Sequence, residues 1–237
     1  MSSGLIADVI AGLEELDSDP GVNVIIIMSN IPRVFCAGRD LEEGSSAKTD
    51  DIFYQLQFAQ ATAGLWLKMQ SVKKVIIGAV HGFALAAGTG IAACCDIVVA
   101  ADNAVFGLPE INVGLWPGTV GPIMARIATH VKRYFELCVT GDRFSAAEAR
   151  ELGLVNRVVA PDKLEEEAVA LAQKIASKSP TTLQIGKRAF YDFMDIEYTK
   201  GVDYSANLTA IIANTHDGKE GQKAFKEKRQ PQWQKPE

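Results

Sequence analysis

The chain has 237 residues, of which 48% are hydrophobic and 22% are charged, and its formal net charge is -5. This length holds one large domain, or one domain with a small helical appendage, and the composition is typical of a globular protein. The negative charge argues against a broad nucleic-acid surface, and no apolar run reaches the roughly 18 residues that a membrane span needs. We therefore expect no nucleic-acid partner and no membrane.

The four cysteines are Cys36, Cys94, Cys95 and Cys138, and none lies in a Cys-x-x-Cys arrangement. Their spacing to the histidines does not fit a zinc site, and adjacent cysteines are poor disulfide partners. We expect reduced, mostly buried thiols and no bound metal. Because no signal peptide is visible, we also expect a cytoplasmic location.

The first half of the chain is predicted to alternate helices and strands. Ser2 and Ser3 can cap a first helix that reaches Leu16, and the turn residues at 19–21 stop it. Apolar β-branched runs predict strands at 22–28 and 74–80, each buried on both faces. Further strands are expected at 96–101 and 104–106, and helices at 51–71, at 88–95 and ending at Ile127. Such alternation implies parallel pairing through crossovers.

Two loops rich in small residues follow the first two of these strands. The first is Phe-Cys-Ala-Gly-Arg-Asp-Leu at 35–41, and the second is His-Gly-Phe-Ala-Leu-Ala-Ala-Gly at 81–88. Parallel strands present such loops at one edge of the sheet, where ligands usually bind. Two converging amides, those of Ala37 and Ala87, can stabilise negative charge on a carbonyl oxygen. The alternative is that the small residues only allow close packing; for the pair of loops we favour the functional interpretation.

Glu110 is the candidate proton carrier for such chemistry. It follows a short strand within a predominantly apolar stretch. A carboxylate in an apolar pocket has a raised pKa and can exchange protons near neutral pH. The alternative is an exposed loop glutamate, and the sequence context leaves the two interpretations about even.

From Ser145 onward the chain becomes mainly helical. Ser145 and Glu148 form a capping box for a short helix that Gly153 ends, and a last strand is expected at 154–159. We predict further helices at 162–177, 181–194, 198–214 and 219–228. The tail at 230–237 contains two prolines and is expected to be loose.

The order of these segments resembles the crotonase superfamily, the enoyl-CoA hydratase/isomerase group. The resemblance covers essentially the whole chain and is most specific at 35–41, 81–96, 106–114 and 141–159. It implies an α/β fold with a ββα spiral core over 1–160 and a C-terminal helical oligomerisation module over 161–237. A homotrimer, or a hexamer built as a dimer of trimers, is expected by this analogy. The family normally begins with two further strands and a loop, so the chain is expected to start late.

The resemblance also implies roles for individual residues. The amides of Ala37 and Ala87 would form the oxyanion hole for an acyl-CoA thioester, and Glu110 would be the general acid/base at its α-carbon. Coenzyme A enters as part of the substrate, and no other cofactor is implied. Contacts to the substrate and its coenzyme A are implied for Ala37, Gly38, Arg39, Asp40, Ala87, Gly88, Phe225 and Lys228. The last two would act within the chain or from a neighbouring subunit.

Two positions depart from the family pattern. Gly90 stands where two-glutamate hydratases carry a second acidic residue, and the sequence has no acidic residue anywhere from 75 to 93. This favours a one-glutamate reaction, either a double-bond shift or hydration with an unidentified second group. Ala87 stands where glycine is usual, so this loop lacks glycine's freedom at positive φ.

Three other interpretations remain open at this point. Gly88 and Gly90 fit a relaxed dinucleotide fingerprint, but the preceding strand ends too early for that motif. Cys36 and His81 can be read as a thiolate pair, or as a packed thiol and a turn residue. The third is a non-catalytic acyl-CoA-binding or scaffold protein of the same fold. If the chain is an enzyme, residues 41–65 and 115–117 are expected to shape its acyl pocket, with Trp66 and Trp116 as candidate walls.

Overall fold

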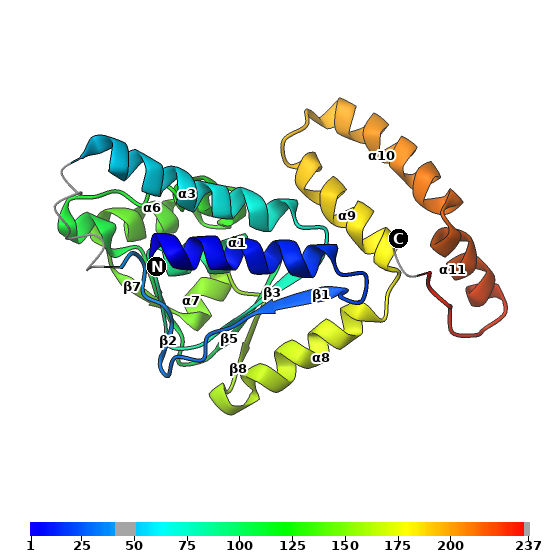
Figure 1. Cartoon of the computed structure of the whole chain (residues 1–237), viewed down its shortest axis with the longest axis horizontal. Helices are drawn as coiled ribbons and strands as arrows, with labels where there is room; N and C mark the ends of the chain where they lie inside the picture. Colours follow the sequence, from blue (N-terminus) through cyan, green and yellow to red (C-terminus); the bar gives the residue numbers. More distant parts are fainter. Residues whose placement is uncertain (41–50, 235–237) are drawn as a thin grey trace.

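The computed structural model describes residues 1–40 and 51–234 and contains two four-stranded sheets (Figure 1). The first sheet has the order β1-β3-β5-β8 and the second the order β2-β4-β6-β7. All neighbouring strands are parallel except β6 and β7, which are antiparallel. The first sheet comprises β1 (Val24–Ile27), β3 (Val75–Val80), β5 (Ile97–Ala101) and β8 (Arg157–Val159). The second comprises β2 (Val34–Cys36), β4 (Phe83–Leu85), β6 (Val105–Gly107) and β7 (Arg143–Ser145).

The chain winds between these sheets as a spiral of strand, strand and helix. Each of the first turns places one strand in the first sheet, the next strand in the second sheet, and then a helix. The elements around the strands are α1 (Ser3–Ser18), α3 (Ile52–Ser71), α4 (Ala87–Cys94), the 3-10 helix η2 (Pro109–Val113), α5 (Gly121–Ile127), α6 (Val131–Thr140) and α7 (Ala146–Glu151). The predicted ββα spiral is therefore confirmed.

Local signals explain where several helices begin. The Ser2 hydroxyl accepts a hydrogen bond from the Leu5 amide at 3.2 Å and caps α1. The capping box of α7 is complete, since Ser145 and Glu148 each accept from the other's backbone amide. Helix α4 is built of small residues and is buried at every position after Ala87. A helix that is apolar all round can be enclosed in this way.

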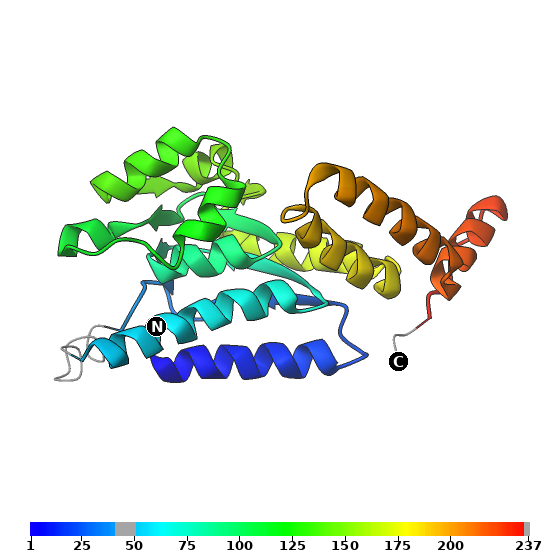
Figure 2. The ribbon, with the colours of Figure 1, turned by 90° about the horizontal axis from the view of Figure 1, so that it is seen from above.

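The C-terminal region begins with η3 (Pro161–Lys163) and α8 (Leu164–Ala176). Helix α8 packs on the first sheet, with Leu164 and Leu171 in one cluster with Ile77 and Val99. Three helices follow, α9 (Pro180–Phe193), α10 (Tyr198–Asn214) and α11 (His216–Lys226). Figures 1 and 2 show α10 and α11 extending away from the sheets, at the opposite end of the molecule from the start of α3.

A buried polar network fastens α9 to the strands. The Lys187 ammonium donates to Asp96 Oδ2 at 2.7 Å and to the Lys74 carbonyl at 2.9 Å. The same carboxylate accepts from the Ile76 amide at 2.7 Å and from the Tyr191 hydroxyl at 2.6 Å. Burial, and next the Asp96 charge, raise the pKa of Tyr191. The network therefore joins α9 to the N-terminal ends of β3 and β5 by charge and hydrogen bonds.

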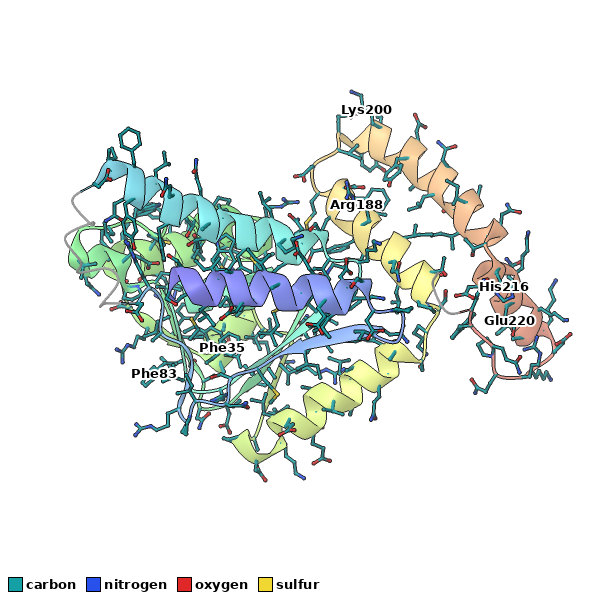
Figure 3. The ribbon with its side chains drawn as sticks, in the orientation of Figure 1. Phe35, Phe83, Arg188, Lys200, His216 and Glu220 are labelled. Atoms are coloured by element: carbon teal, nitrogen blue, oxygen red, sulfur yellow. The ribbon has the colours of Figure 1, made fainter. Side chains whose placement is uncertain are left out.

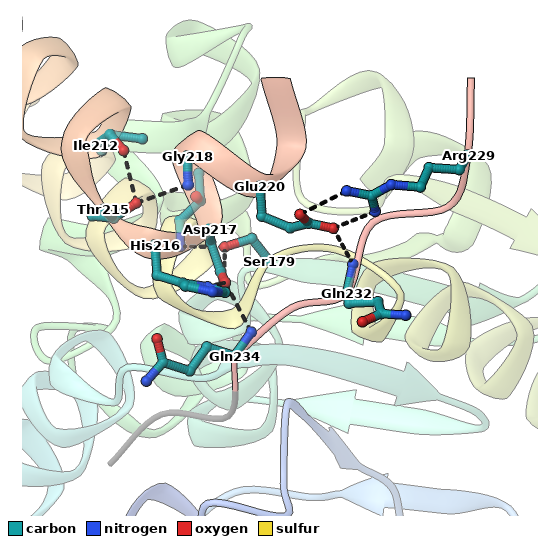
Figure 4. Close-up of polar contacts among 11 residues, drawn as sticks. Ser179, Ile212, Thr215, His216, Asp217, Gly218, Glu220, Arg229, Gln232 and Gln234 are labelled. Carbon is teal, nitrogen blue, oxygen red and sulfur yellow. Dashed lines mark hydrogen bonds and ion pairs between the residues drawn. The ribbon is translucent and has the colours of Figure 1, made fainter. Parts of the chain in front are cut away.

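The tail is held in place through Gln234, so the expectation of a loose tail is wrong for 230–234. The Gln232 amide donates to Glu220 at 2.7 Å, and the Gln234 amide donates to Asp217 at 2.9 Å (Figure 4). The Trp233 indole donates to the Ser177 carbonyl at 2.9 Å. The tail is therefore hydrogen-bonded to α11 and to the C-terminal end of α8. Residues 235–237 lie outside the described part of the chain.

Several short elements differ from the expectations. The loop predicted at 81–88 contains β4, and the prediction missed β2, β7 and α6. Strand β1 lies at the edge of its sheet and is packed on both faces, although only Ile25 in it is fully buried. Ile27 packs on the same side as Ile25, and Val24 and Ile26 pack against the cluster that contains Leu164 and Leu171. In the part of the chain that the structure describes, no helix is long and apolar enough to cross a membrane.

Candidate active site

The two amide-rich segments contact each other at the ends of β2 and β4. A Cβ atom built on Gly38 would lie 2.9 Å from the Ala86 Cβ and 3.9 Å from the Ala87 nitrogen. A Cβ built on Gly88 would lie 2.0 Å from the Cys36 carbonyl oxygen. Both glycines therefore permit an approach that any side chain would block. The structure brings the segments containing Ala37 and Ala87 together, as their positions after neighbouring strands predicted.

The backbone at the start of α4 is unusual at Ala86 rather than at Ala87. Ala86, the N-cap, has φ 51° and ψ -118°, whereas Ala87 is the first helical residue. A positive φ at a residue other than glycine costs on the order of 1–3 kcal/mol and persists only when the surroundings enforce it. The sequence-based concern about positive φ therefore applies one position earlier. Here the Ala86 amide donates to the Gly107 carbonyl at 2.8 Å, which helps to hold this conformation.

We expect Gly88→Ala to destabilise the protein by about 1–3 kcal/mol, because the methyl group would overlap the Cys36 carbonyl and force the segments apart. Urea unfolding measures this change. Gly64→Ala in α3 is the matched control, since its added Cβ would meet nothing within 4 Å. That substitution is expected to stabilise the protein by about 0.5–1 kcal/mol through helix propensity. Equal effects of the two substitutions would contradict the packing role of Gly88.

Thr89, near the start of α4, is hydrogen-bonded to β4 and to β6, the strand that precedes Glu110. Its fully buried hydroxyl lies 2.7 Å from the Ala84 carbonyl oxygen and 2.9 Å from the Gly107 carbonyl oxygen. The contacts join the start of α4 to the ends of β4 and β6. Sequence analysis gave Thr89 no role, because its polar partners are backbone groups distant in the chain.

Glu110 lies in η2, immediately after Pro109, whose fixed φ favours the first turn of a helix. The Glu110 carbonyl accepts from the Leu115 amide at 3.0 Å, which closes the loop behind it. Its Oε2 atom is buried and has no hydrogen-bond partner among the described residues. Burial raises the pKa of the Glu110 carboxyl, and a backbone hydrogen bond offsets part of that rise. Of the two interpretations of this residue, the structure supports the partly buried acid.

A cavity of about 370 Å³ joins these features. Its walls include Glu110, Ala87 and Arg39, together with residues of α3 and of the segment after η2. The further lining residues are Met1, Gln55, Phe58, Ala59, Thr62, Ala86, Leu115, Trp116, Pro117, Gly118 and Thr119. Of the stretches 41–65 and 115–117 that were expected to shape an acyl pocket, the cavity is lined by residues within 55–62 and by 115–117, which include Trp116. Positions 41–50 lie outside the described residues.

Trp66 occupies the space beside Gly90. A Cβ built on Gly90 would lie 2.8 Å from Trp66 Cζ2 and 3.0 Å from Val120 Cγ2. Trp66 lines an adjoining apolar cavity of about 470 Å³, which shares Ala59, Gly118 and Thr119 with the first. Trp66 is thus a wall of the second cavity, and its indole explains why position 90 carries no side chain.

The remaining candidate residues are distributed between the two ends of the molecule. The Asp40 amide donates to the Met1 carbonyl at 2.9 Å, and the Met1 amino group donates to the Gly38 carbonyl. Phe225 is 86% exposed near the end of α11, and Lys228 follows that helix. Figure 3 shows that α11, labelled at His216 and Glu220, lies far from the strands of the second sheet, labelled at Phe35 and Phe83. Within one chain, Phe225 and Lys228 are therefore not brought to the cavity.

The dinucleotide-binding and thiolate-pair interpretations find no geometric support. The His81 Nε2 atom lies 3.0 Å from the Ile31 carbonyl oxygen, and no described hydrogen bond joins His81 to Cys36. Gly88 packs against Cys36 and Gly90 against Trp66, so neither glycine leaves space for a pyrophosphate. All four cysteines are unpaired.

Comparisons with known proteins identify the family and the fold of this chain. A family model described as Enoyl-CoA hydratase/isomerase matches residues 1–236. The chain is 35% identical over 233 residues to a probable mitochondrial enoyl-CoA hydratase of Dictyostelium discoideum, covering 98% of this chain and 82% of that protein. It is 36% identical over 233 residues to a probable enoyl-CoA hydratase of Mycobacterium leprae, covering 98% and 88%. It is also similar to the crystal structure of an enoyl-CoA hydratase from Mycobacterium smegmatis, with a TM-score of 0.92, 34% identity, and coverage of 98% and 89%.

Proposed function

Because the chain belongs to the enoyl-CoA hydratase/isomerase family of enzymes, we propose that it moves a proton at the α-carbon of an enoyl-CoA thioester. The observation that carries this proposal is the Glu110 carboxyl, which lines the same cavity as Ala87 and whose buried Oε2 atom has no hydrogen-bond partner within residues 1–40 and 51–234. Such a carboxyl group has both a raised pKa and a free oxygen to receive a proton. No redox or metal cofactor is part of the proposal.

The amides of Ala37 and Ala87 would bind the thioester carbonyl oxygen. As the α-proton leaves, negative charge moves onto that oxygen, and two fixed N–H donors stabilise the enolate more than the neutral thioester. The contacts of Gly38 and Gly88 with the opposite segment support this role, since they hold the two amide-bearing segments together. The N-terminus of α4, where Ala87 is the first helical residue, carries the positive end of the helix dipole, which would also stabilise the negative oxygen.

A shift of the double bond fits the site better than a two-carboxylate hydration. The Glu110 carboxylate would take a proton from the α-carbon of a 3-enoyl-CoA, forming a dienolate, and return it to the γ-carbon to give the 2-enoyl-CoA. This sequence needs one carboxyl group, and Glu110 is the one carboxylate among the described residues that line the cavity. Hydration is the second candidate, because the similar proteins named above are called hydratases.

Coenzyme A would lie along the backbone from Ala37 to Asp40 and leave the cavity toward a neighbouring subunit. Phe225 is exposed near the end of α11 and Lys228 follows that helix, which lies at the opposite end of the molecule from the start of α3 (Figure 1), so these residues would serve the nucleotide of another copy. A homotrimer, or a dimer of trimers, would supply that arrangement. A lysine there can pair with a phosphate of coenzyme A.

Turnover of positional isomers tests the proposed function. We expect the protein to interconvert 3-enoyl- and trans-2-enoyl-CoA of the same chain length, followed by the absorbance of the conjugated thioester and by chromatography. Accumulation of 3-hydroxyacyl-CoA instead would establish hydration as the main reaction. Binding of both thioesters without any change in either, and without α-proton exchange, would contradict the proposal and favour a non-catalytic binding protein.

A further inference from the structure

The Arg39 side chain lines the cavity, and some of its hydrogen-bond donors have no acceptor among the described residues. Its guanidinium carbon lies 4.2 Å from the centre of the Phe58 ring, and its Nη1 donates to the Gln55 side-chain oxygen at 2.8 Å. These two contacts, both to α3, fix the plane and the direction of the group. Its Nε and Nη2 atoms are buried and have no partner among the described residues.

The two unpartnered nitrogens lie on the same edge of the guanidinium. In arginine, the Nε–H and one Nη2–H are parallel, so this edge is a fork that matches the two oxygens of a carboxylate. No described carboxylate forms an ion pair with it: Glu110 lines the same cavity, but its Oε2 is also unpartnered. Arg39 as a whole is half-buried, but these two donor atoms are buried, and buried donors without a partner are costly unless a ligand supplies the acceptor.

The position of Arg39 indicates which part of the ligand carries that anion. Arg39 lines the cavity that also contains Glu110 and Ala87, where the α-carbon and thioester carbonyl are proposed to lie. The pantetheine arm of coenzyme A holds its phosphates far from the sulfur, so they do not reach a cavity of this size together with the α-carbon. The acyl group is the part that shares the cavity with Arg39.

We infer that the Arg39 fork binds a carboxylate on the acyl group, so that the preferred substrates are enoyl-CoA thioesters whose acyl chain ends in a carboxylate. The inference rests on the proposed function. It adds a substrate class that the catalytic groups themselves do not determine. The aromatic face of Phe58 and the amide of Gln55 then act as positioning groups that hold the fork toward the cavity.

The test compares pairs of enoyl-CoA thioesters of equal chain length, one ending in a methyl group and one in a carboxylate. For the wild-type protein we expect kcat/KM to favour the carboxylate member by about 10- to 100-fold, the range for a hydrogen-bonded charge pair. Arg39→Met should remove this preference by lowering kcat/KM about 10- to 100-fold more for the carboxylate member than for the methyl-ended member. Arg39→Lys, which keeps the charge but not the fork, should lose most of it.

Arg143→Met is the matched control, because Arg143 also stacks on a phenylalanine, 5.1 Å from the Phe83 ring centre, but does not line this cavity. It should leave the preference unchanged. An equal loss for both substrates in Arg39→Met would overturn the inference and assign the side chain to coenzyme A or to packing. A wild-type preference for the methyl-ended member would overturn it even if the variants fail to fold. If the wild type turns over neither member, the proposed function fails, and the inference fails with it.

Discussion

Replacing Glu110 by glutamine is expected to lower kcat for double-bond migration by about 10²- to 10⁴-fold, the usual contribution of a positioned acid or base. Glutamine has nearly the same shape but cannot accept a proton from the α-carbon. Because the side chain is partly buried and its Oε2 atom has no hydrogen-bond partner in the part of the chain that the structure describes, the substitution breaks no hydrogen bond of that atom there. KM should therefore change little, and incorporation of solvent deuterium at the α-carbon, followed by NMR, should fall with kcat.

The pH dependence of the wild type gives this prediction a second readout. The reaction begins with the ionised carboxylate, and burial raises the pKa of Glu110 above its ordinary value of 4.5. Activity should therefore be low in acid and increase with pH as the carboxyl ionises, with an apparent pKa above that value. The Glu110→Gln variant has no such group, so the residual activity should not show this step. A profile that declines over the same range would instead assign Glu110 as the acid.

Glu136→Gln provides the control for a glutamate outside the cavity. Glu136 lies in α6, is largely exposed and pairs with Arg133 at 3.0 Å on the same helix. A surface pair of this kind contributes little to stability, and its loss should leave turnover unchanged. If deuterium enters the α-carbon equally fast in the wild type and in Glu110→Gln, Glu110 is not the proton carrier.

Lys187→Met is expected to lower the free energy of unfolding by about 3–5 kcal/mol, because it leaves the buried Asp96 carboxylate without its cation. The Lys187 side chain is only 5% exposed and the Asp96 side chain 13%. The Ile76 amide and the Tyr191 hydroxyl would remain as donors, but neither carries a charge. Urea unfolding measures the loss, and α9 should become more accessible to proteases because the network fastens it to the strands.

The adjacent residue supplies a matched control. Arg188 pairs with Asp192 on the surface of the same helix, with its side chain 74% exposed, so Arg188→Met should change stability by less than about 0.5 kcal/mol. Adding Asp96→Asn to Lys187→Met should recover part of the lost stability, because the uncompensated charge is removed. A Lys187→Met variant as stable as Arg188→Met would show that the buried pair contributes nothing beyond its packing.

The sequence predicted the fold where its signals were long or chemically specific. The apolar runs of β3 and β5 and the Ser145–Glu148 capping box occur as expected. Strands of three residues, such as β4 and β7, were missed because so short a segment has no distinctive period; pairing with β6 defines them. Helix α6 was missed as well, and its N-cap, His130, forms no side-chain capping bond.

The candidate site was predictable only in part for a similar reason. Small residues after neighbouring strands indicated that the segments with Ala37 and Ala87 would meet. For Glu110, the apolar context left a buried acid and an exposed loop glutamate about equally open. The contacts of Arg39 with Phe58 and Gln55 were not predictable, because they depend on how α3 lies across the loop. The hydroxyl of Thr89 is a similar case, since its acceptors are carbonyl groups of two different strands.

The indole beside Gly90 limits how a second acid could be engineered into this enzyme. A glutamate introduced alone at position 90 would begin with its Cβ 2.8 Å from the Trp66 ring, a side chain that is only 7% exposed. Shrinking Trp66 first would open a void that costs about 3–5 kcal/mol until the new side chain fills it. Neither single substitution is a tolerable intermediate, so the two residues would have to be exchanged together.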